Sequence, residues 1–483
     1  METRSLKFVA EAIGVEIKSG SLDLKIENVC IDSRTAKAGD LFFAIKGEKF
    51  DGHDFIAEVA AKGVAVAVVA RASRPFVDQK LTGKLPVPLL EVDDVRAALG
   101  KFAAAYRRQF DLPIVAVAGS NGKTTVKELI ASVLRRKFST LWSEASFNND
   151  IGVPLTLLRL DKSHRAAVLE AGTNHPGELA PLVKMIQPKF GVLTNIGREH
   201  LEFFGDVAGV AREEGALAEL LPADGKLFLN GDNEWSEKIA ARTKAKVVRV
   251  GLGEQNDWRA KKIRLDKNGV TFSGAGILPV QTGGTPVPRS EFSGEWRVNL
   301  LGKHQVTNAL FAIAVGAELG LSREEIQRGL AECAPPKMRL NFWEAGGVRV
   351  LDDCYNANAD STVAALETLC GLPLQGRRVA VLGDMGELGA HSAAAHAEVG
   401  RRAAELGIGQ LFAIGKMSAV TAQAARDAGL ARVIEFADVG GAVAVIRNFL
   451  RPSDVVLLKA SRSSRLERIV EALRGGTGVP PVG

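Results

Sequence analysis

The sequence GSNGKTT at residues 119–125 is the segment with the clearest chemical meaning in this chain. It follows an apolar run and precedes a helical pattern, so it would form a turn between a strand and a helix. Gly119 and Gly122 let the backbone turn tightly and bring N–H groups close to phosphate oxygens. Lys123 at the helix start can reach the β- and γ-phosphates, and the hydroxyl of Thr124 can ligate magnesium. The segment therefore predicts a site for a nucleoside triphosphate.

The match to the general phosphate-loop pattern is incomplete. G-x-x-x-x-G-K-[ST] requires glycine where this chain has Val117, which leaves the shorter form G-x-x-G-K-T-T. A glycine-rich turn that binds nothing is the alternative, but Lys-Thr-Thr at a helix start has no obvious packing reason. We expect the whole loop to contact phosphate, through Gly119, Ser120, Asn121, Gly122, Lys123, Thr124 and Thr125.

Composition limits the class of protein. The 483 residues exceed a single core, and 46% hydrophobic with 24% charged residues are typical of soluble globular proteins. A net charge of +6 over this length does not indicate nucleic acid or a membrane surface. The charged segment 1–11 lacks a signal core, and the apolar run 64–70 is too short to span a bilayer. We expect a cytoplasmic monomer without stable membrane insertion, whose four widely spaced cysteines are reduced.

The order of predicted elements gives an α/β fold with three domains. Residues 1–108 resemble a small α/β domain with strands at 40–45 and 64–70 and a helix at 95–109. Residues 109–320 alternate strands with helices, which predicts a mainly parallel sheet of the phosphate-loop ATPase kind, with strands at 114–118, 166–170, 190–195 and 226–230.

The third domain, at 321–474, begins with a predicted helix cap at Ser322 and Glu325. Five strands separated by alanine-rich helices predict a doubly wound, Rossmann-like domain, with strands at 348–351, 378–382, 410–414, 432–436 and 454–459. The Gly/Pro-rich segment 475–483 is expected to be a disordered tail.

Polar residues follow two strands of the central domain. In an open parallel sheet, ligands bind beyond the carboxyl ends of the strands, so Glu170 and the segment 195–200 should face the phosphate loop. Glu170 is a plausible magnesium ligand, because hard cations prefer carboxylate oxygens, and a salt bridge to Lys123 is the alternative. His200 by itself is more consistent with a capping or packing histidine.

The chain resembles the Mur ligase family of peptidoglycan synthesis over nearly its whole length. The resemblance rests on the phosphate loop and seven further blocks, at 148–154, 170–178, 200–205, 302–309, 352–358, 383–389 and 459–463. The blocks DDCYNAN and GDMGELG resemble the branch that adds D-alanyl-D-alanine to UDP-N-acetylmuramoyl-tripeptide. The D-N-P-[RA] block of the sister ligase, which adds the third amino acid, is not found.

The resemblance implies ATP and Mg²⁺ as the cofactors. A carboxylate of the UDP-linked peptide would attack the γ-phosphate of ATP, and the amine of the dipeptide would then displace phosphate from the acyl phosphate. Phosphorylation is needed because a carboxylate has no good leaving group, and catalysis would depend on positioning and charge stabilisation. We also expect an open form without ligand and domain closure with it.

The resemblance also implies roles for individual residues. Lys123, Glu170 and His200 would be catalytic, and Asn308, Arg339 and Asp353 would join the phosphate loop at ATP. Residues of all three domains would bind the substrate, namely Ser33, Arg34, Lys46, Gly47, Asn148, Asn149, Asp150, Asn356, Asn358, Lys459, Ser461 and Arg462. The metal ligands would be Thr124, Glu170 and His200.

One position departs from the family pattern. Glu214 stands where the family usually has a carbamylated lysine that helps hold the second magnesium ion. Carbamate and carboxylate are both planar anionic oxygen donors, so Glu214 is a fourth candidate metal ligand, although its reach is shorter. The alternative is a surface glutamate on a solvated helix.

Two other functions stay open from the sequence. One is a related ligase, either a Mur-type enzyme that adds the third amino acid or a folyl-polyglutamate synthetase relative. The other is a nucleotide-binding module without turnover, which the change at Glu214 favours and the intact Lys123, Thr124, Glu170 and His200 oppose.

Overall fold

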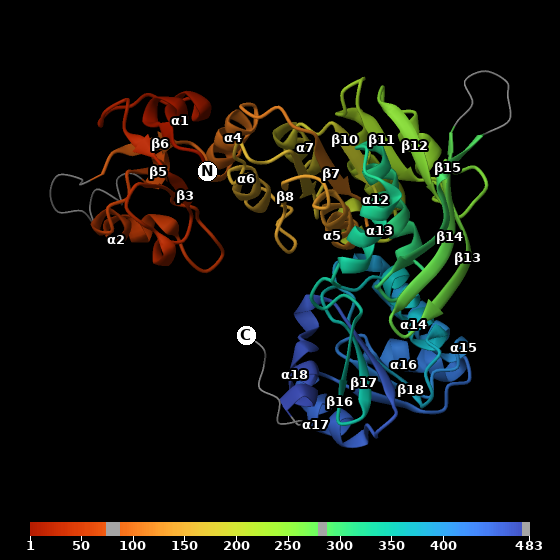
Figure 1. Cartoon of the computed structure of the whole chain (residues 1–483). Helices are drawn as coiled ribbons and strands as arrows, with labels where there is room; N and C mark the ends of the chain where they lie inside the picture. Colours follow the sequence, from red (N-terminus) through yellow and green to blue (C-terminus); the bar gives the residue numbers. More distant parts are fainter. Residues whose placement is uncertain (74–86, 279–286, 476–483) are drawn as a thin grey trace. The chain divides into compact units, whose positions relative to one another are not determined.

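The computed structural model describes residues 1–73, 87–278 and 287–475 (Figure 1). These residues pack as two compact units. Unit 1 contains residues 1–116, 138–172 and 179–190, and unit 2 contains 117–137, 173–178 and the chain from 191 onward. The predicted tail at 476–483 lies outside the described residues. The predicted domain boundaries at 108 and 320 stay predictions.

Unit 1 begins with a parallel four-stranded sheet in the order β3-β4-β5-β6. Its strands are β3 (Asn28–Cys30), β4 (Asp40–Phe43), β5 (Val66–Ala70) and β6 (Leu89–Val92). The helices are α1 (Leu6–Ile13), α2 (Ile56–Ala61) and α4 (Val95–Arg107), and a short ribbon pairs β1 (Arg4–Ser5) with β2 (Lys25–Ile26). β4 and β5 confirm two predicted strands; apart from the buried Asp40 their residues are apolar, and both faces are buried.

The rest of unit 1 holds the first part of the central sheet. β8 (Thr140–Trp142) pairs in parallel with β9 (Ala166–Glu170), and β9 is next to β7 (Ile114–Ala118). The helices α6 (Gly152–Leu157) and α7 (Leu179–Ile186) both pack against α4. All five residues of β9 are buried, so its end brings Glu170 to the carboxyl edge of the sheet from inside the core.

Unit 2 contains six further strands, β10 to β15. The order runs β10 (Phe190–Leu193), β11 (Lys226–Asn230), β12 (Lys246–Gly251), β13 (Trp258–Asp266), β14 (Gly269–Leu278) and β15 (Val287–Val298), the last two joining antiparallel. α5 (Lys123–Leu134) packs against α12 (Gln305–Glu318) and α13 (Arg323–Glu332). The short helices between β10 and β12 are α8 (Leu201–Phe204), α9 (Val207–Glu214), α10 (Ala216–Glu219) and α11 (Ser236–Ala240).

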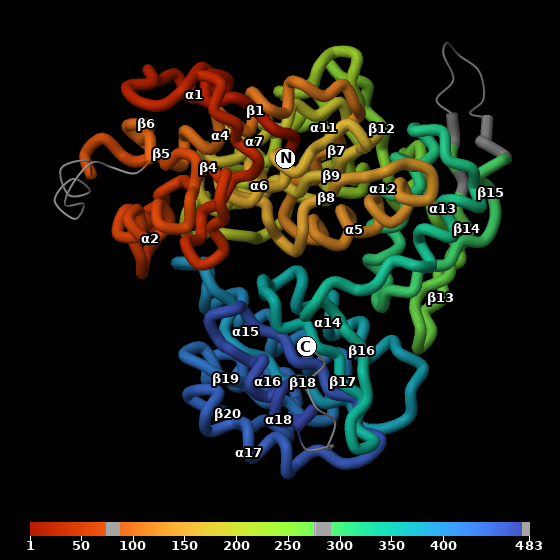
Figure 2. Tube along the Cα trace, turned by 60° about the vertical axis from the view of Figure 1, so that its left-hand side comes forward, coloured from red at the N-terminus to blue at the C-terminus, as the bar shows by residue number. Residues whose placement is uncertain are grey.

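A second sheet in unit 2 has the order β16-β17-β21-β18-β19-β20 (Figure 2). Only β16 (Asn341–Ala345) joins antiparallel; the others are β17 (Val348–Asp353), β18 (Arg378–Gly383), β19 (Gln410–Ile414), β20 (Val433–Phe436) and β21 (Val455–Lys459). The core cluster on one face takes residues from α14 (Ala359–Gly371), α15 (Ser392–Glu405) and α16 (Ser418–Asp427). The other face is covered by α17 (Val439–Phe449) and α18 (Glu467–Gly475).

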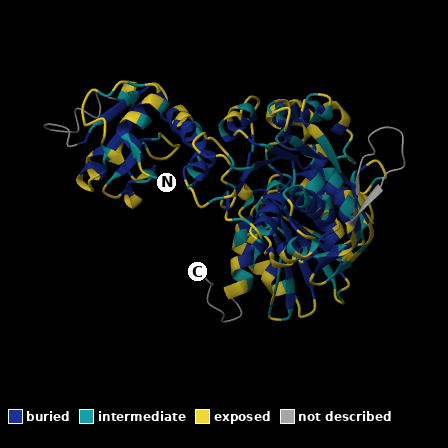
Figure 3. Cartoon of the chain, turned by 45° about the horizontal axis from the view of Figure 1, so that its top comes forward, coloured by how far each residue is buried: buried dark blue, intermediate teal, exposed yellow. Residues whose placement is uncertain are grey.

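These sheets confirm the predicted α/β class, including the central parallel sheet and the doubly wound third domain. Buried residues fill the strands and the helix faces that meet them (Figure 3). The predicted helix start is also confirmed, since Ser322 and Glu325 form a reciprocal capping box on α13. None of the described helices is long and apolar enough to span a bilayer.

Candidate active site

The phosphate loop has the predicted strand–turn–helix form. It joins β7 to α5, and both glycines lie in the left-handed region, with φ of 113° at Gly119 and 85° at Gly122. A Cβ on Gly119 would lie 2.5 Å from Thr194 Oγ1, so a side chain is excluded there by conformation and by space. Gly122 is the N-cap of α5 and provides no side-chain acceptor to the first turn. The helix start keeps the character of an anion site.

Two side chains from other segments hold the loop in shape. Asn195 accepts hydrogen bonds from the backbone N–H of Asn121 through Oδ1, at 2.7 Å, and from that of Ser120 through its carbonyl, at 2.9 Å. Glu214 Oε2 accepts from the backbone N–H of Gly119 at 2.7 Å. Asn195 was not predicted as a site residue, although its position directly after β10 was a signal that could have identified it. The loop is therefore fixed before any ligand binds.

The side chain of Lys123 contacts the backbone of the phosphate loop. Its Nζ donates to the carbonyl oxygens of Gly119 at 2.5 Å and Ser120 at 3.3 Å. It also forms an ion pair of 3.3 Å with Glu199 Oε2, and Glu199 is 6% exposed. The position at the start of α5 agrees with a phosphate-binding role, and Glu199 is a second residue that the sequence analysis missed.

His200 is the N-cap residue of α8 and has a left-handed backbone, with φ of 46°. Its Nδ1 forms a hydrogen bond with Glu387 from the GDMGELG block, and this bond lowers the pKa of Glu387. Its Nε2 lies 3.9 Å from Glu199 Oε2. A carboxylate on one ring nitrogen fixes the orientation of the imidazole and leaves the other nitrogen for a ligand.

Glu214 is fully buried at the end of α9, so the alternative of a solvated surface glutamate is wrong. Burial raises the pKa of Glu214 to about 8, opposed by the charge of Lys123 and reinforced by that of Glu199. Its Oε1 has no hydrogen-bond partner among the described residues. A carboxylate in this setting is poised to accept a cation or to hold a proton.

Glu170 belongs to unit 1 and is 1% exposed. Its Oε1 accepts from Asn148 Nδ2 at 2.8 Å, and its Oε2 lacks a hydrogen-bond partner within the described part of the chain. Asn149 Oδ1 accepts from the backbone N–H of Gly152, the first residue of α6, at 2.9 Å. Asp150 pairs with Arg96 of α4 at 3.3 Å. The structure thus brings Glu170 and Asn148 together and gives their two neighbours structural partners.

Two asparagines lie beside the phosphate loop. A Cβ on Gly122 would lie 3.0 Å from Asn308 Oδ1, which places Asn308 directly against the start of α5. Asn358 caps α14 and donates from Nδ2 to Asn121 Oδ1 at 2.9 Å. Residues of the central and third predicted domains therefore meet at the loop, as expected for a shared nucleotide site.

The remaining third-domain candidates surround the ends of β17 and β21. Lys459 Nζ contacts Asp353 Oδ2 at 2.6 Å and the carbonyl of Asn356 at 3.0 Å. Ser461 Oγ lies 3.2 Å from Asn356 Oδ1 and accepts from the backbone N–H of Gly386 at 2.8 Å. These contacts hold the DDCYNAN and GDMGELG blocks together at the carboxyl ends of neighbouring strands.

Two arginines lie close to this cluster in sequence. The guanidinium of Arg339 lies 4.2 Å from the centre of the Tyr355 ring. Arg462 is exposed, with Nη1 3.7 Å from Glu467 Oε1. Arg339 therefore stacks on the DDCYNAN block, whereas Arg462 is exposed and lies near the half-buried Glu467.

The four candidates of the first domain follow β3 and β4, which pair in parallel and therefore end at the same edge. Ser33 is buried and its carbonyl accepts from Lys62 at 2.7 Å, whereas Arg34 is exposed and pairs with Asp32 at 2.6 Å. Lys46 and Gly47 lie in the turn after β4. The two loops are neighbours, which agrees with one binding region in unit 1.

The donors suit magnesium but do not form a finished metal site. Glu170 and Glu214 each offer a buried carboxylate oxygen without a partner among the described residues, and hard cations prefer such oxygens. Within the same residues, no group of three or more His, Cys, Asp or Glu side chains is arranged to hold a metal ion. Magnesium usually completes its shell with water and phosphate oxygens, so each of these carboxylates by itself fits an ion that arrives with a nucleotide.

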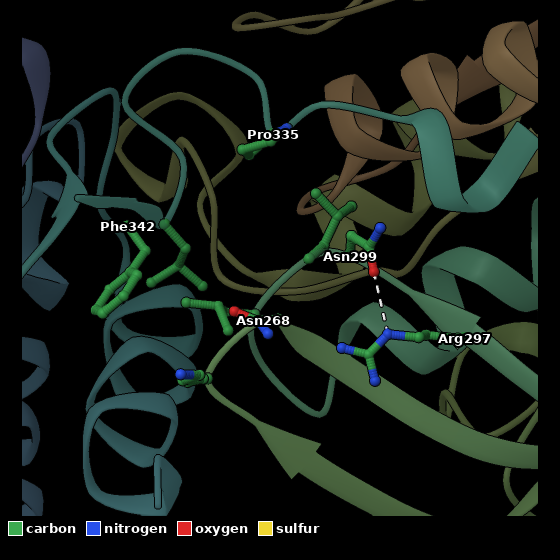
Figure 4. Close-up of a pocket in the computed structure, with 9 residues that line it drawn as sticks. Asn268, Arg297, Asn299, Pro335 and Phe342 are labelled. Carbon is green, nitrogen blue, oxygen red and sulfur yellow. Dashed lines mark hydrogen bonds between the residues drawn. The ribbon is translucent and has the colours of Figure 1, made fainter. Parts of the chain in front are cut away.

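A separate cavity of about 500 Å³ lies in unit 2 (Figure 4). It is bounded by the turn between β13 and β14, the end of β15 and the segment that leads into β16. Arg297 Nε donates to Asn299 Oδ1 at 3.2 Å on its wall. None of its lining residues belongs to the predicted site, so it contributes no support for the nucleotide assignment.

Comparison with known proteins identifies three Mur ligase models along the chain. They are described as Mur ligase family, catalytic domain (residues 25–107), Mur ligase middle domain (117–316) and Mur ligase, glutamate ligase domain (338–462). Proteins named UDP-N-acetylmuramoyl-tripeptide--D-alanyl-D-alanine ligase are similar over full length. That of Escherichia coli is 36% identical over 95% of this chain and 97% of its own, and that of Bacillus subtilis is 31% identical over 98% and 99%.

A solved structure gives the same result. The crystal structure of MurF from Acinetobacter baumannii is 32% identical, covers 98% of this chain and 99% of its own, and superposes with a TM-score of 0.86. The similarity therefore includes the arrangement of secondary structure as well as the motifs. On this evidence, the chain belongs to the Mur ligase family.

Proposed function

We propose that this protein is the ATP-dependent ligase that joins D-alanyl-D-alanine to UDP-N-acetylmuramoyl-tripeptide in peptidoglycan precursor synthesis. The observation that carries the proposal is the phosphate loop, fixed by Asn195 and Glu214 with Lys123 at the helix start. The full-length relatives of that name support the choice of substrates. The four free cysteines agree with a reducing cytoplasm, and we propose a monomer because one chain supplies every assigned residue.

The reaction divides into two transfers. The terminal carboxylate of the tripeptide takes the γ-phosphoryl group of ATP, which gives an acyl phosphate and ADP. The amine of D-alanyl-D-alanine then attacks the acyl carbon, loses a proton and expels inorganic phosphate. Lys123 and the N–H groups at the start of α5 would stabilise the charge of the transferred phosphoryl group. Asn308, Arg339 and Asp353 would bind the rest of the nucleotide.

Thr124, Glu170, His200 and Glu214 would hold magnesium. The bound ion would neutralise phosphate charge and polarise the phosphoryl oxygens. Glu387 would orient His200 through its Nδ1. Glu214 would act without the modification that a lysine needs at this position, because its carboxyl group becomes an anionic oxygen donor when a cation displaces its proton.

The peptide substrate would contact residues of all three predicted domains. The loops after β3 and β4 would bind the uridine nucleotide through Ser33, Arg34, Lys46 and Gly47. Asn148, Asn149 and Asp150 would line the muramoyl-peptide path. The third-domain loops would contact nucleotide and peptide through Asn356, Asn358, Lys459, Ser461 and Arg462, and their closure over the site would protect the acyl phosphate from water.

A labelled substrate tests this function directly. Purified protein is incubated with ATP, D-alanyl-D-alanine and tripeptide that carries oxygen-18 in its terminal carboxylate. Phosphate release should require both acceptors, and one labelled oxygen should appear in the released phosphate. Release without transfer of the label would exclude an acyl phosphate, and binding of ATP without release would indicate a module without turnover. Lys123→Met is the negative control, in which we expect no phosphoryl transfer.

A further inference from the structure

Glu199 lies in the segment that follows β10, and its carboxylate is almost fully removed from solvent, with 6% of the residue exposed. Its Oε2 contacts Lys123 Nζ at 3.3 Å and lies 3.9 Å from His200 Nε2. Its Oε1 has no hydrogen-bond partner among the residues that the structure describes. When only one oxygen of a buried carboxylate has a partner, the other oxygen still lacks a hydrogen-bond donor or a cation.

Glu214 at the end of α9 is also a buried carboxyl group in which only one of the two oxygens has a hydrogen-bond partner among the described residues. It is fully buried, Oε2 accepts from the backbone N–H of Gly119, and Oε1 is unpartnered within the described ranges. The charges of Lys123 and Glu199 both act on Glu214, so the three groups form one electrostatic cluster. The cluster contains two carboxylates and one ammonium group beneath the phosphate loop.

Nucleotide binding changes the balance of charge in this cluster. Lys123 now rests on two carbonyl oxygens of its own loop and on Glu199. When its ammonium group turns to the phosphates, the Glu199 carboxylate loses its ion-pair partner just as further negative charge arrives. A buried carboxylate without a counter-ion is strongly unfavourable. A divalent cation that enters with the phosphates removes this cost.

We propose that the Glu199 carboxylate is a ligand of the magnesium ion that accompanies the nucleotide, with phosphate and water oxygens completing the shell of the ion. The unpartnered oxygen of Glu199 and the position of its carboxylate beside His200 Nε2 carry this assignment. It rests on the proposed function in one respect, because a nucleotide must bind at the loop. A role of Glu199 limited to holding Lys123 before the nucleotide arrives is the competing explanation.

Metal binding separates these two explanations without any turnover. Mn²⁺, which electron paramagnetic resonance detects, replaces Mg²⁺ and is titrated into the ADP complex of wild type, Glu199→Gln and Glu199→Asp. Glu202→Gln is the matched control, because Glu202 is an exposed glutamate three residues along the same segment. The affinity for ADP is measured in parallel with a chelator present, and circular dichroism confirms that each variant is folded.

We expect Glu199→Gln to weaken Mn²⁺ binding at least about tenfold, while Glu199→Asp loses less and Glu202→Gln stays at the wild-type value. Unchanged Mn²⁺ affinity in Glu199→Gln would overturn the proposal, whether or not ADP binding changes. An equal loss of Mn²⁺ affinity in Glu202→Gln would also overturn the proposal, because it would show that removing any nearby negative charge has the same effect. If Glu199→Gln does not fold, the comparison of Glu199→Asp with Glu202→Gln decides in the same way.

The outcome is independent of the ligase assignment. Phosphate release by the wild type in the presence of both acceptors tests the proposed function alone. A wild type without this turnover, but with Mn²⁺ binding that depends on Glu199, would reject the substrates and keep the metal ligand. The reverse result would keep the ligase and reject the ligand.

Discussion

Replacement of Glu214 by glutamine should change how stability depends on pH. Burial raises the pKa of Glu214 from 4.5 to about 8. Between these values the folded protein holds a proton that the unfolded chain has released, so the free energy of unfolding falls as the pH rises. Glutamine has nearly the same shape, can still accept from the Gly119 N–H and carries no ionisable proton. As the pH rises, the free energy of unfolding should therefore fall less in Glu214→Gln than in wild type.

The size of the effect follows from the two pKa values. At roughly 1.4 kcal/mol for each pH unit, the interval from 4.5 to about 8 corresponds to on the order of 5 kcal/mol at pH 9. The assay is the thermal midpoint of the ligand-free protein from pH 4.5 to 9, with Glu202→Gln as an exposed control. The two midpoints should be similar at the acid end, and Glu214→Gln should exceed wild type by several degrees at the alkaline end.

Parallel pH profiles of wild type and Glu214→Gln would refute the reasoning, because they would show that Glu214 titrates normally. A larger alkaline loss in the variant would refute it as well. Magnesium with a non-hydrolysable ATP analogue provides a second check. A cation beside Glu214 favours the ionised carboxylate, so the alkaline loss of the wild type should shrink when both are present.

Three further substitutions test the loop. Gly119→Ala should lower the free energy of unfolding, measured by urea denaturation, by at least about 2 kcal/mol, because φ is 113° and Thr194 Oγ1 occupies the space of the new side chain. An unchanged denaturation midpoint would contradict this. Asn195→Ala should weaken binding of an ATP analogue about tenfold in calorimetry, because the Asn121 N–H loses its acceptor, and unaltered affinity would exclude that role. Asn358→Asp keeps the side-chain cap of α14 but cannot donate a hydrogen bond to Asn121 Oδ1. We therefore expect kcat to fall while the melting midpoint stays within a few degrees of wild type. A fall in kcat accompanied by a comparable loss of thermal stability would indicate a structural role.

Strands with continuous apolar runs were predictable from the sequence. The prediction at 114–118 matches β7 residue for residue, and those at 166–170 and 226–230 match β9 and β11, because strands buried on both faces leave a simple pattern. β13 was missed. β13 carries several exposed charged residues and a register shift between Lys261 and Arg264, so neither alternation nor an apolar run marks it.

The positions of site residues along the chain were also predictable, but their partners were not. The motif at 119–125 predicted the phosphate loop, and the rule that ligands bind beyond strand ends pointed to Glu170 and the segment 195–200, whereas the role of His200 came only from the family resemblance. Asn195 and Glu199 lie in the same segment as His200, yet their contacts with the loop depend on how that segment folds back. Nothing local in the sequence distinguishes an asparagine that holds a loop from one that caps a turn.

Glu213 and Glu214 show where sequence reasoning stops. Successive residues on a helix point about 100° apart, so two adjacent glutamates at the end of α9 must face different surroundings. Glu213 accepts from the backbone N–H of Gly177 at 2.7 Å and from Thr173 Oγ1 at 3.3 Å, and so holds the loop 173–178. Glu214 lies beneath the phosphate loop without solvent. The sequence shows that one of the pair can face inward, but only tertiary packing decides which one loses its water and so becomes the carboxylate that a cation can satisfy.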